Sequence, residues 1–185
     1  MPMTARPAST ARRFAREIRG AVAVEFAVLA PLLVLLYFGM SEMTQAFMAK
    51  RRLGNTASLM GDIAAQNPTI TQARVDDIFQ IGNTVMRPFA TTTLRWCVAS
   101  VVSDSDGKDT IAWVAPKNSP TDCPAKGAVV SYVSPDLLPA SASVIMSSVS
   151  YEYVPTLKLL GTKFVFKKSF YLRPRKSDSV AWATS

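Results

Sequence analysis

The sequence predicts an α+β protein: a long N-terminal helix, a second short helix, and then a mostly antiparallel β-sheet. Two observations carry this prediction. The chain is continuously apolar over residues 21–40 and keeps a helical periodicity up to residue 66. Beyond residue 90, apolar and polar residues alternate with a period of two, which is typical of antiparallel strands. With 185 residues, the chain is long enough for one domain and an appendage.

The apolar run from Ala21 to Met40 has Glu25 as its only charged residue. A helix rises about 1.5 Å per residue, so this run would be roughly 30 Å long and would cross the hydrocarbon core of a bilayer. Basic residues lie on both sides of it: Arg6, Arg12, Arg13, Arg16 and Arg19 before, and Lys50, Arg51 and Arg52 after. The charge distribution favours a cytoplasmic N-terminus, although the second cluster weakens the asymmetry.

A cleaved secretory signal peptide is the alternative interpretation of this run. A signal peptide has a shorter apolar core and a small-residue cleavage site directly after it. Here Ser41, Glu42 and Met43 follow, without such a site. The run therefore favours a membrane-spanning helix.

The net charge of +8 does not indicate a nucleic-acid partner. In residues 1–20, five arginines against Glu17 leave +4, and the rest of the chain has 16 basic and 12 acidic residues, again +4. A basic tail beside an apolar span is a topology signal, and the remaining charges are spread along the chain. We therefore expect no nucleic acid among the partners.

Residues 41–66 continue the helix with an amphipathic pattern. We expect the apolar stripe to comprise Met43, Phe47, Leu53, Ala57, Met60 and Ala64. We expect the opposite side to carry Glu42, Gln45, Arg51, Arg52, Asn55 and Asp62. Asn67-Pro68 ends the helix, because the residue before a proline avoids the helical conformation. A plain membrane anchor with a helical stalk would explain all of this except Glu25.

The remaining chain predicts one short helix and about four strands. The helix covers residues 71–87, with a buried face of Val75, Ile78, Phe79, Val85 and Met86. Half-buried strands are expected at residues 93–102, 110–115, 143–154 and 163–173, bounded by Pro, Gly and Asp clusters.

Cys97 and Cys123 both lie in this outer region. With a cytoplasmic N-terminus, one membrane span places them outside the cytoplasm, where disulfides persist. We expect a disulfide between them, worth about 3–4 kcal/mol on the chain-entropy model. Two unconnected thiols are the alternative.

The chain has no histidine, which excludes the Ser-His-Asp and Cys-His types of nucleophilic catalysis and the common zinc sites. It also lacks a glycine loop with the spacing that cradles phosphates. We therefore expect no catalytic residues, no metal site and no cofactor, and a function other than that of an enzyme.

Glu25 is the unusual residue of the span. A charged side chain costs about 2.5–3.5 kcal/mol at the centre of a membrane helix, less near the interface, and usually marks function or a partner. If the chain were cut between Gly20 and Ala21, the new ammonium group on Ala21 would lie four residues from Glu25, on the same helical face. Glu25 would then be the counter-charge of a terminus created by proteolysis.

A basic leader ending in Gly20, followed by a small residue and by Glu25-Phe26, resembles the processing signature of type IV pilin-like proteins. Residues 16–66 most resemble the TadE-like family, minor pseudopilins of the Tad (Flp) tight-adherence pilus apparatus. The late segments VSYEYVPTL and FYLRPR are similar to the C-terminal strands of that family. The resemblance implies a pilin-like fold and cleavage by a prepilin peptidase at the cytoplasmic face. It also implies three kinds of partner: the lipid bilayer, other Tad pilus subunits and pseudopilins, and the inner-membrane assembly platform.

The predicted organisation is a cleaved leader (1–20), an N-terminal helix (21–66) with a transmembrane half (21–40), and a periplasmic α+β domain (67–185). The expected location is the bacterial inner membrane or the pilus. The predicted function is that of a structural subunit, with Gly20 and Ala21 as the processing site and Glu25 and Phe26 as assembly residues. Two alternatives remain: an uncleaved, membrane-anchored periplasmic binding or sensor domain, and a membrane-anchored enzyme.

Overall fold

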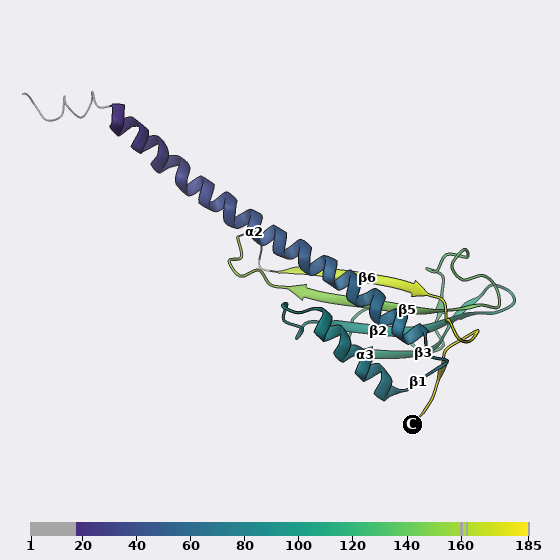
Figure 1. Cartoon of the computed structure of the whole chain (residues 1–185). Coiled ribbons are helices and arrows are strands. Elements are labelled where there is room, and N and C mark those ends of the chain that lie inside the picture. Colours follow the sequence, from purple (N-terminus) through teal and green to yellow (C-terminus); the bar gives the residue numbers. More distant parts are fainter. Residues whose placement is uncertain (1–17, 160, 162, 185) are drawn as a thin grey trace, which may run out of the picture.

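The computed structural model describes residues 18–159, 161 and 163–184, and it has the predicted α+β class (Figure 1). Within the described residues, the first element is a helix of 48 residues, α2, which begins slightly earlier than the sequence indicates. In chain order the elements are α2 (Ile18–Ala65), β1 (Thr69–Ile70), α3 (Gln72–Val85), β2 (Arg95–Ser103), β3 (Asp109–Lys117), β4 (Val129–Val130), β5 (Ser143–Tyr153), β6 (Phe164–Leu172) and β7 (Ala181–Trp182).

The main sheet has the strand order β4-β3-β2-β5-β6, and each neighbouring pair is antiparallel. Its four long strands correspond to the four predicted runs. The two-residue strands were not predicted, because so short a segment has no periodicity to detect. Two of them, β1 and β7, form a separate parallel pair that joins the chain after α2 to the C-terminal segment.

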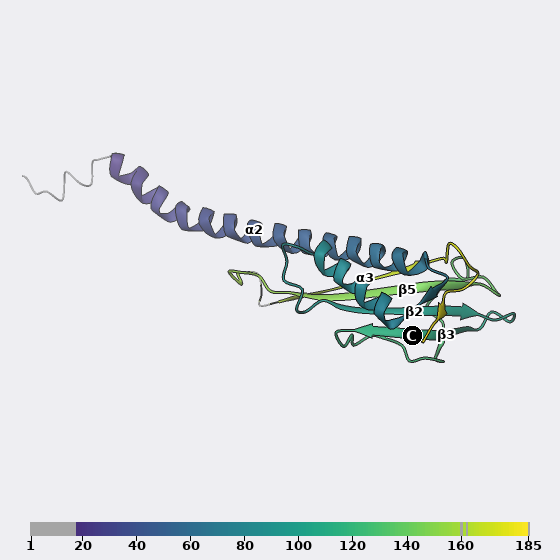
Figure 2. The same cartoon turned by 60° about the horizontal axis from the view of Figure 1, so that its bottom comes forward.

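One face of the sheet is covered by the second half of α2 and by α3 (Figure 2). α2 packs along β5 and β6, and α3 lies beside α2 and reaches β3. α2 and the sheet are in close contact where Ala57 of the helix meets Ser147 of β5, because both side chains are small. The Trp96 indole donates to Ser147 Oγ over 3.0 Å, and Ser147 donates to the carbonyl oxygen of Ala57 over 2.8 Å. This core includes Leu53, Ala57, Met60, Val75, Ile78, Met86, Trp96, Val98, Ile145 and Tyr151.

The buried stripe of α2 differs from the predicted one in its first turns. Met43 and Phe47 are exposed, the latter by 61%, while Ala46 and Ala49 are buried. From Leu53 onwards the predicted residues are buried as expected. The prediction chose the large apolar side chains, whereas the helix approaches the sheet through small ones.

Two residues assigned to the polar side of α2 are also placed differently. Glu42 is only 3% exposed, and Arg52 is half-buried, where it donates to the carbonyl oxygens of Val85 and Arg87 at the end of α3. In α3, Val75, Ile78 and Met86 are buried as predicted, whereas Phe79 and Val85 are only half-buried.

The other face of the sheet has a core of its own, which the sequence did not indicate. Residues from the segment between β3 and β5 pack onto it, so β2 is buried on both faces rather than half-buried. This second core comprises Cys97, Ala99, Val101, Ile111, Val130, Val133, Leu138, Val144 and Met146.

A β-bulge in β3 distributes its side chains between the two cores. Ser100 pairs with Trp113 and Val101 with Ile111, which leaves Ala112 as the extra residue. An inserted residue shifts the alternation of faces by one. Trp113 therefore lies in the core under α2, and Ile111 lies in the second core.

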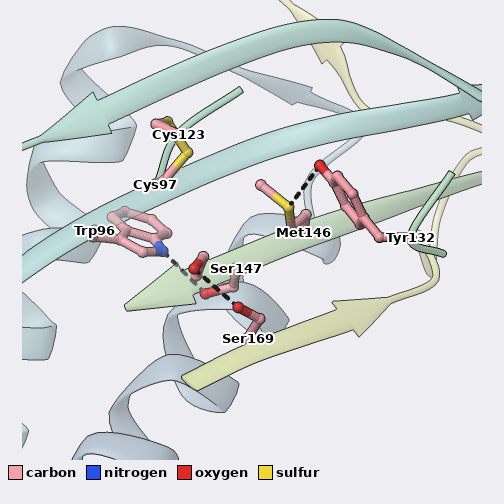
Figure 3. The surroundings of a disulfide bond; sticks show 8 residues. Trp96, Cys97, Cys123, Tyr132, Met146, Ser147 and Ser169 are labelled. Carbon is pink, nitrogen blue, oxygen red and sulfur yellow. Dashed lines mark hydrogen bonds between the residues drawn. A yellow bond between two sulfur atoms is a disulfide. The ribbon is translucent and has the colours of Figure 1, made fainter. Parts of the chain in front are cut away.

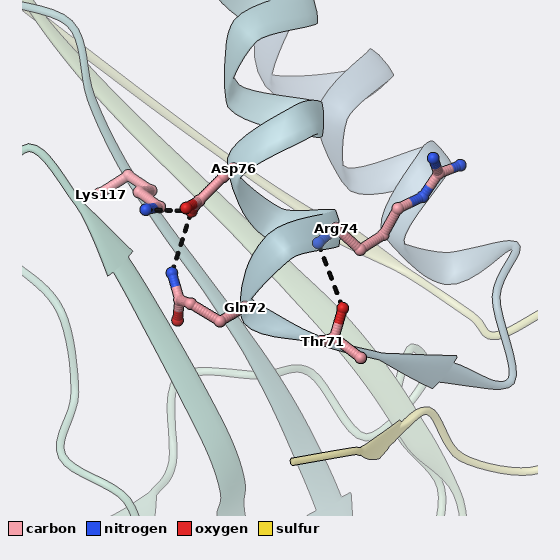
Figure 4. A network of polar contacts seen from close by, with 5 residues as sticks. All are labelled: Thr71, Gln72, Arg74, Asp76 and Lys117. Carbon is pink, nitrogen blue, oxygen red and sulfur yellow. Dashed lines mark hydrogen bonds and ion pairs between the residues drawn. The ribbon is translucent and has the colours of Figure 1, made fainter. Parts of the chain in front are cut away.

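α3 begins with a side-chain cap and is joined to β3 by an ion pair (Figure 4). Thr71 has an extended backbone and its hydroxyl accepts from the backbone N–H of Arg74 over 3.2 Å, which satisfies one of the free amides of the first turn. Asp76 accepts hydrogen bonds from Lys117 and Gln72, and the bond from Lys117 lowers the pKa of the Asp76 carboxyl below its ordinary value. Because Asp76 is exposed, this pair adds little stability.

Candidate functional site

The first half of α2 extends away from the domain, and its side chains are exposed almost throughout (Figure 1). Its most apolar window has a mean hydropathy of 2.3, and none of it is buried. By length and composition, this one helix can cross a membrane. The large exposed apolar side chains are Val22, Val24, Phe26, Val28, Leu29, Leu32, Leu33, Val34, Leu35, Leu36, Tyr37, Phe38 and Met40.

Gly20 and Ala21, the predicted processing site, lie on the first turns of α2 and are exposed. A side-chain carbon added at Gly20 would meet nothing within 4 Å. Nothing in the described structure therefore requires glycine at this position. Residues 1–17 of the predicted leader lie outside the described residues.

Glu25 and Phe26, the predicted assembly residues, are also exposed on α2. Ala21 and Glu25 are four residues apart within one continuous helix, so they lie on the same face, one turn apart. The charge-pairing hypothesis needs this spacing, which any continuous helix over these residues provides. The role of Glu25 itself stays a prediction.

Pro31 lies inside α2, and the helix continues through it. A proline removes one backbone hydrogen bond and is tolerated in membrane helices. Figure 2 shows that α2 is curved, so the axis of its exposed half is inclined to the axis of the half that packs on the sheet.

Glu42 occupies a position that sequence reasoning missed. Its carboxylate accepts hydrogen bonds from the backbone N–H groups of Leu157 over 2.6 Å and of Leu159 over 3.0 Å, in the chain after β5. Burial and, to a smaller extent, the negative charge of Glu42 raise the pKa of Tyr153. The only signal in the sequence was an acidic residue just beyond the apolar run, which does not reveal a partner more than 100 residues away.

An open groove of about 630 Å³ lies between α2 and β6. It combines the exposed ring of Phe47 with three basic side chains, and it is lined by Phe47, Lys50, Arg51, Gly54, Asn55, Ser58, Lys168 and Phe170. Within the described residues, no group of three or more His, Cys, Asp or Glu side chains could hold a metal ion.

The predicted disulfide is present: Cys97 on β2 is bonded to Cys123 on the segment after β3 (Figure 3). It fastens this segment over the second core, where the Tyr132 hydroxyl also contacts Met146 Sδ at 3.6 Å. The bond closes a loop with a sequence separation of 26, so it contributes about 3–4 kcal/mol on the chain-entropy model.

We expect both cysteines to be oxidised in the protein isolated from cells. Cys97 is buried, so alkylation should be carried out in denaturant, where burial no longer protects a thiol. Without reductant, neither cysteine should be alkylated, and with reductant both should be, as read by peptide mass. Alkylation of both thiols before reduction would contradict the pairing and an oxidising location of the domain.

A comparison with protein families found a match, which lies in the N-terminal helix. Residues 20–59 match the family model described as TadE-like protein, which covers most of α2 and leaves the sheet outside. No curated protein and no solved structure matches the chain. The match confirms the resemblance over this segment, which includes Gly20, Ala21, Glu25 and Phe26. Over residues 20–59, the N-terminal helix of this chain is therefore similar to the TadE-like family.

Proposed function

We propose that this protein is a minor pseudopilin of a Tad (Flp) pilus, a structural subunit and not an enzyme. A prepilin peptidase removes residues 1–20, and the mature chain remains anchored in the bacterial inner membrane or enters the pilus. The α+β domain lies in the periplasm. Its partners are the bilayer, other pilus subunits and pseudopilins, and the inner-membrane assembly platform.

One observation carries this proposal: Glu25 lies one turn from Ala21 on an exposed apolar helix whose residues 20–59 are TadE-like. A carboxylate there is costly in lipid unless it has a counter-charge. Cleavage before Ala21 creates that counter-charge. A plain anchor gives no reason for the acid.

The uncleaved, membrane-anchored binding or sensor domain is the second candidate. In that case Gly20 would be an ordinary residue of the helix and the leader would persist. The two candidates therefore differ first in the N-terminus of the mature protein.

We expect the mature chain to begin at Ala21. The intact mass of the protein extracted from membranes of cells that possess the peptidase should be lower than that of the unprocessed protein by the mass of residues 1–20. We expect Gly20→Leu to retain the leader, because the side chain would obstruct the peptidase. The structure leaves space for it, so the fold should be unchanged.

Gly39→Leu is the matched control for this experiment. Gly39 lies on the same exposed half of α2, and a side-chain carbon there would also meet nothing within 4 Å. This variant should be processed as the wild type is. A wild-type protein that keeps residues 1–20 in these cells would refute the pseudopilin function and favour the anchored domain.

A further inference from the structure

The chain after β5 exposes apolar side chains at the end of the domain nearest the apolar half of α2. In residues 154–159, called here the 154–159 loop, Val154 and Leu157 are each 50% exposed and Leu159 is 46% exposed. Lys158 lies between the two leucines. Figures 1 and 2 both show this part of the chain beside α2, reaching beyond the ends of the neighbouring strands toward the apolar half.

Glu42 holds this loop on α2. The backbone N–H groups on both sides of Lys158 donate to its carboxylate, at 2.6 and 3.0 Å. Lys158 has a φ of 58°, in the left-handed region, and such a residue allows neighbouring amides to converge on one anion. With these amides turned to Glu42, the side chains of Leu157 and Leu159 remain exposed.

The position of Glu42 along α2 sets the height of the loop relative to a membrane. Glu42 follows Met40, the last residue of the apolar run, by two positions, or about 3 Å of helix rise. Side chains on a helix tilt toward its N-terminus, so the carboxylate lies closer to the apolar run than its own backbone does. The interfacial region of each leaflet is about 5–7 Å thick. The loop amides therefore lie within this region when residues 21–40 span the bilayer.

We propose that the 154–159 loop is a second membrane contact of this protein, in addition to α2. Leu157 and Leu159 enter the interfacial region of the leaflet from which α2 emerges, and Glu42 braces the loop against the helix. Lys158 lies at the level of the lipid phosphates, the usual arrangement of a cation beside apolar side chains at an interface. The two contacts together orient the domain on the membrane. This inference rests on the membrane anchoring in the proposed function.

A lipid surface is the occupant that the structure favours over a protein. Glu42 holds the exposed leucines beside the end of the continuous apolar run of α2, so these leucines and the run lie next to each other along the direction of the membrane normal. A bilayer around α2 reaches the loop without any further partner.

The test uses the full chain in nanodiscs of phosphatidylcholine and phosphatidylglycerol, with one spin label at a time. Leu159→Cys reports on the loop, Leu35→Cys on the span, and Leu137→Cys is the matched control. Leu137 is 47% exposed, like Leu159, but lies before the start of β5, at the opposite end of a strand roughly 35 Å long. The native cysteines are bonded to each other, so only the new cysteine is labelled without reductant.

Accessibility to oxygen, which is enriched in lipid, is compared with accessibility to a water-soluble nickel chelate. We expect the oxygen-to-nickel ratio to be highest at position 35 and lowest at 137. At position 159 it should be severalfold above the ratio at 137. In a Glu42→Ala background, the ratio at 159 should fall toward that at 137, while the ratio at 35 stays unchanged.

Three results would overturn the inference. A ratio at 159 equal to that at 137, with the label at 35 in lipid, removes the second contact and leaves the anchor intact. A label at 159 shielded from both reagents indicates packing against protein, from a second copy or another partner. A label at 35 in water refutes the membrane anchor of the proposed function, and the loop contact with it.

Discussion

Glu25→Ala is expected to leave the protein in the membrane but to abolish its assembly with pilus partners. Removing a charge makes the span more apolar, so insertion should be unaffected. After cleavage, the ammonium group of Ala21 would lack its counter-charge within the membrane, and a buried charge without a partner is strongly destabilising. The measurement is the yield of pili and the co-purification of pilus subunits, with the level of the protein determined in parallel.

Glu25→Asp is the control for this variant, because it keeps the carboxylate and shortens only its reach. We expect it to retain more assembly than Glu25→Ala. Cleavage should persist in both, because Gly20 and Ala21 are unchanged. Wild-type piliation by Glu25→Ala at a normal protein level would show that Glu25 is an incidental interfacial residue, as in a plain anchor.

Gly61→Leu is expected to destabilise the domain by about 3 kcal/mol or more, because it overpacks the contact between α2 and the sheet. A side-chain carbon at Gly61 would lie 2.6 Å from Leu172 Cδ1 and 2.8 Å from Ser147 Cβ. Ser147 is fully buried and links the Trp96 indole to the backbone of α2, so it cannot move without breaking these hydrogen bonds. The melting temperature of the detergent-solubilised chain, followed by tryptophan fluorescence, measures the effect.

Gly54→Leu is the matched control, since Gly54 lies two turns earlier on the same helix and a side-chain carbon there would meet nothing within 4 Å. Leucine favours a helix over glycine by up to about 1 kcal/mol, so this variant should be unchanged or slightly more stable. Equal melting temperatures for the two variants would show that α2 does not pack on the sheet through Gly61.

The apolar helix, the second helix and the four long strands could be predicted because their signals are local. A continuous apolar run, a helical pattern over residues 71–87, and alternation with a period of two all lie within a few neighbouring residues. The resemblance of the segment with Gly20, Ala21, Glu25 and Phe26 to a processing signature could also be recognised from the sequence, because that signature is defined by the order and spacing of its residues.

The placement of side chains between elements depended on contacts between distant residues. Nothing near Glu42 predicts that its carboxylate binds amides 115 and 117 residues later. The pattern of α2 favoured Met43 and Phe47 as buried, yet the sheet approaches through alanines and glycine, where the backbone can come closer. Which residues of a helix are buried depends on the element that packs against the helix, and the sequence of the helix alone does not specify that element.

The second core shows most clearly that burial depends on contacts between distant segments. β2 alternates as a half-buried strand would, but the segment between β3 and β5 covers its other face and is fastened there by the disulfide. The sequence by itself determined a helix long and apolar enough to cross a membrane, the order of the long elements and the two cysteines available for pairing. Only the tertiary structure decided which faces are covered and where Glu42 holds the 154–159 loop, because burial arises from packing between segments and not from the periodicity of any one of them.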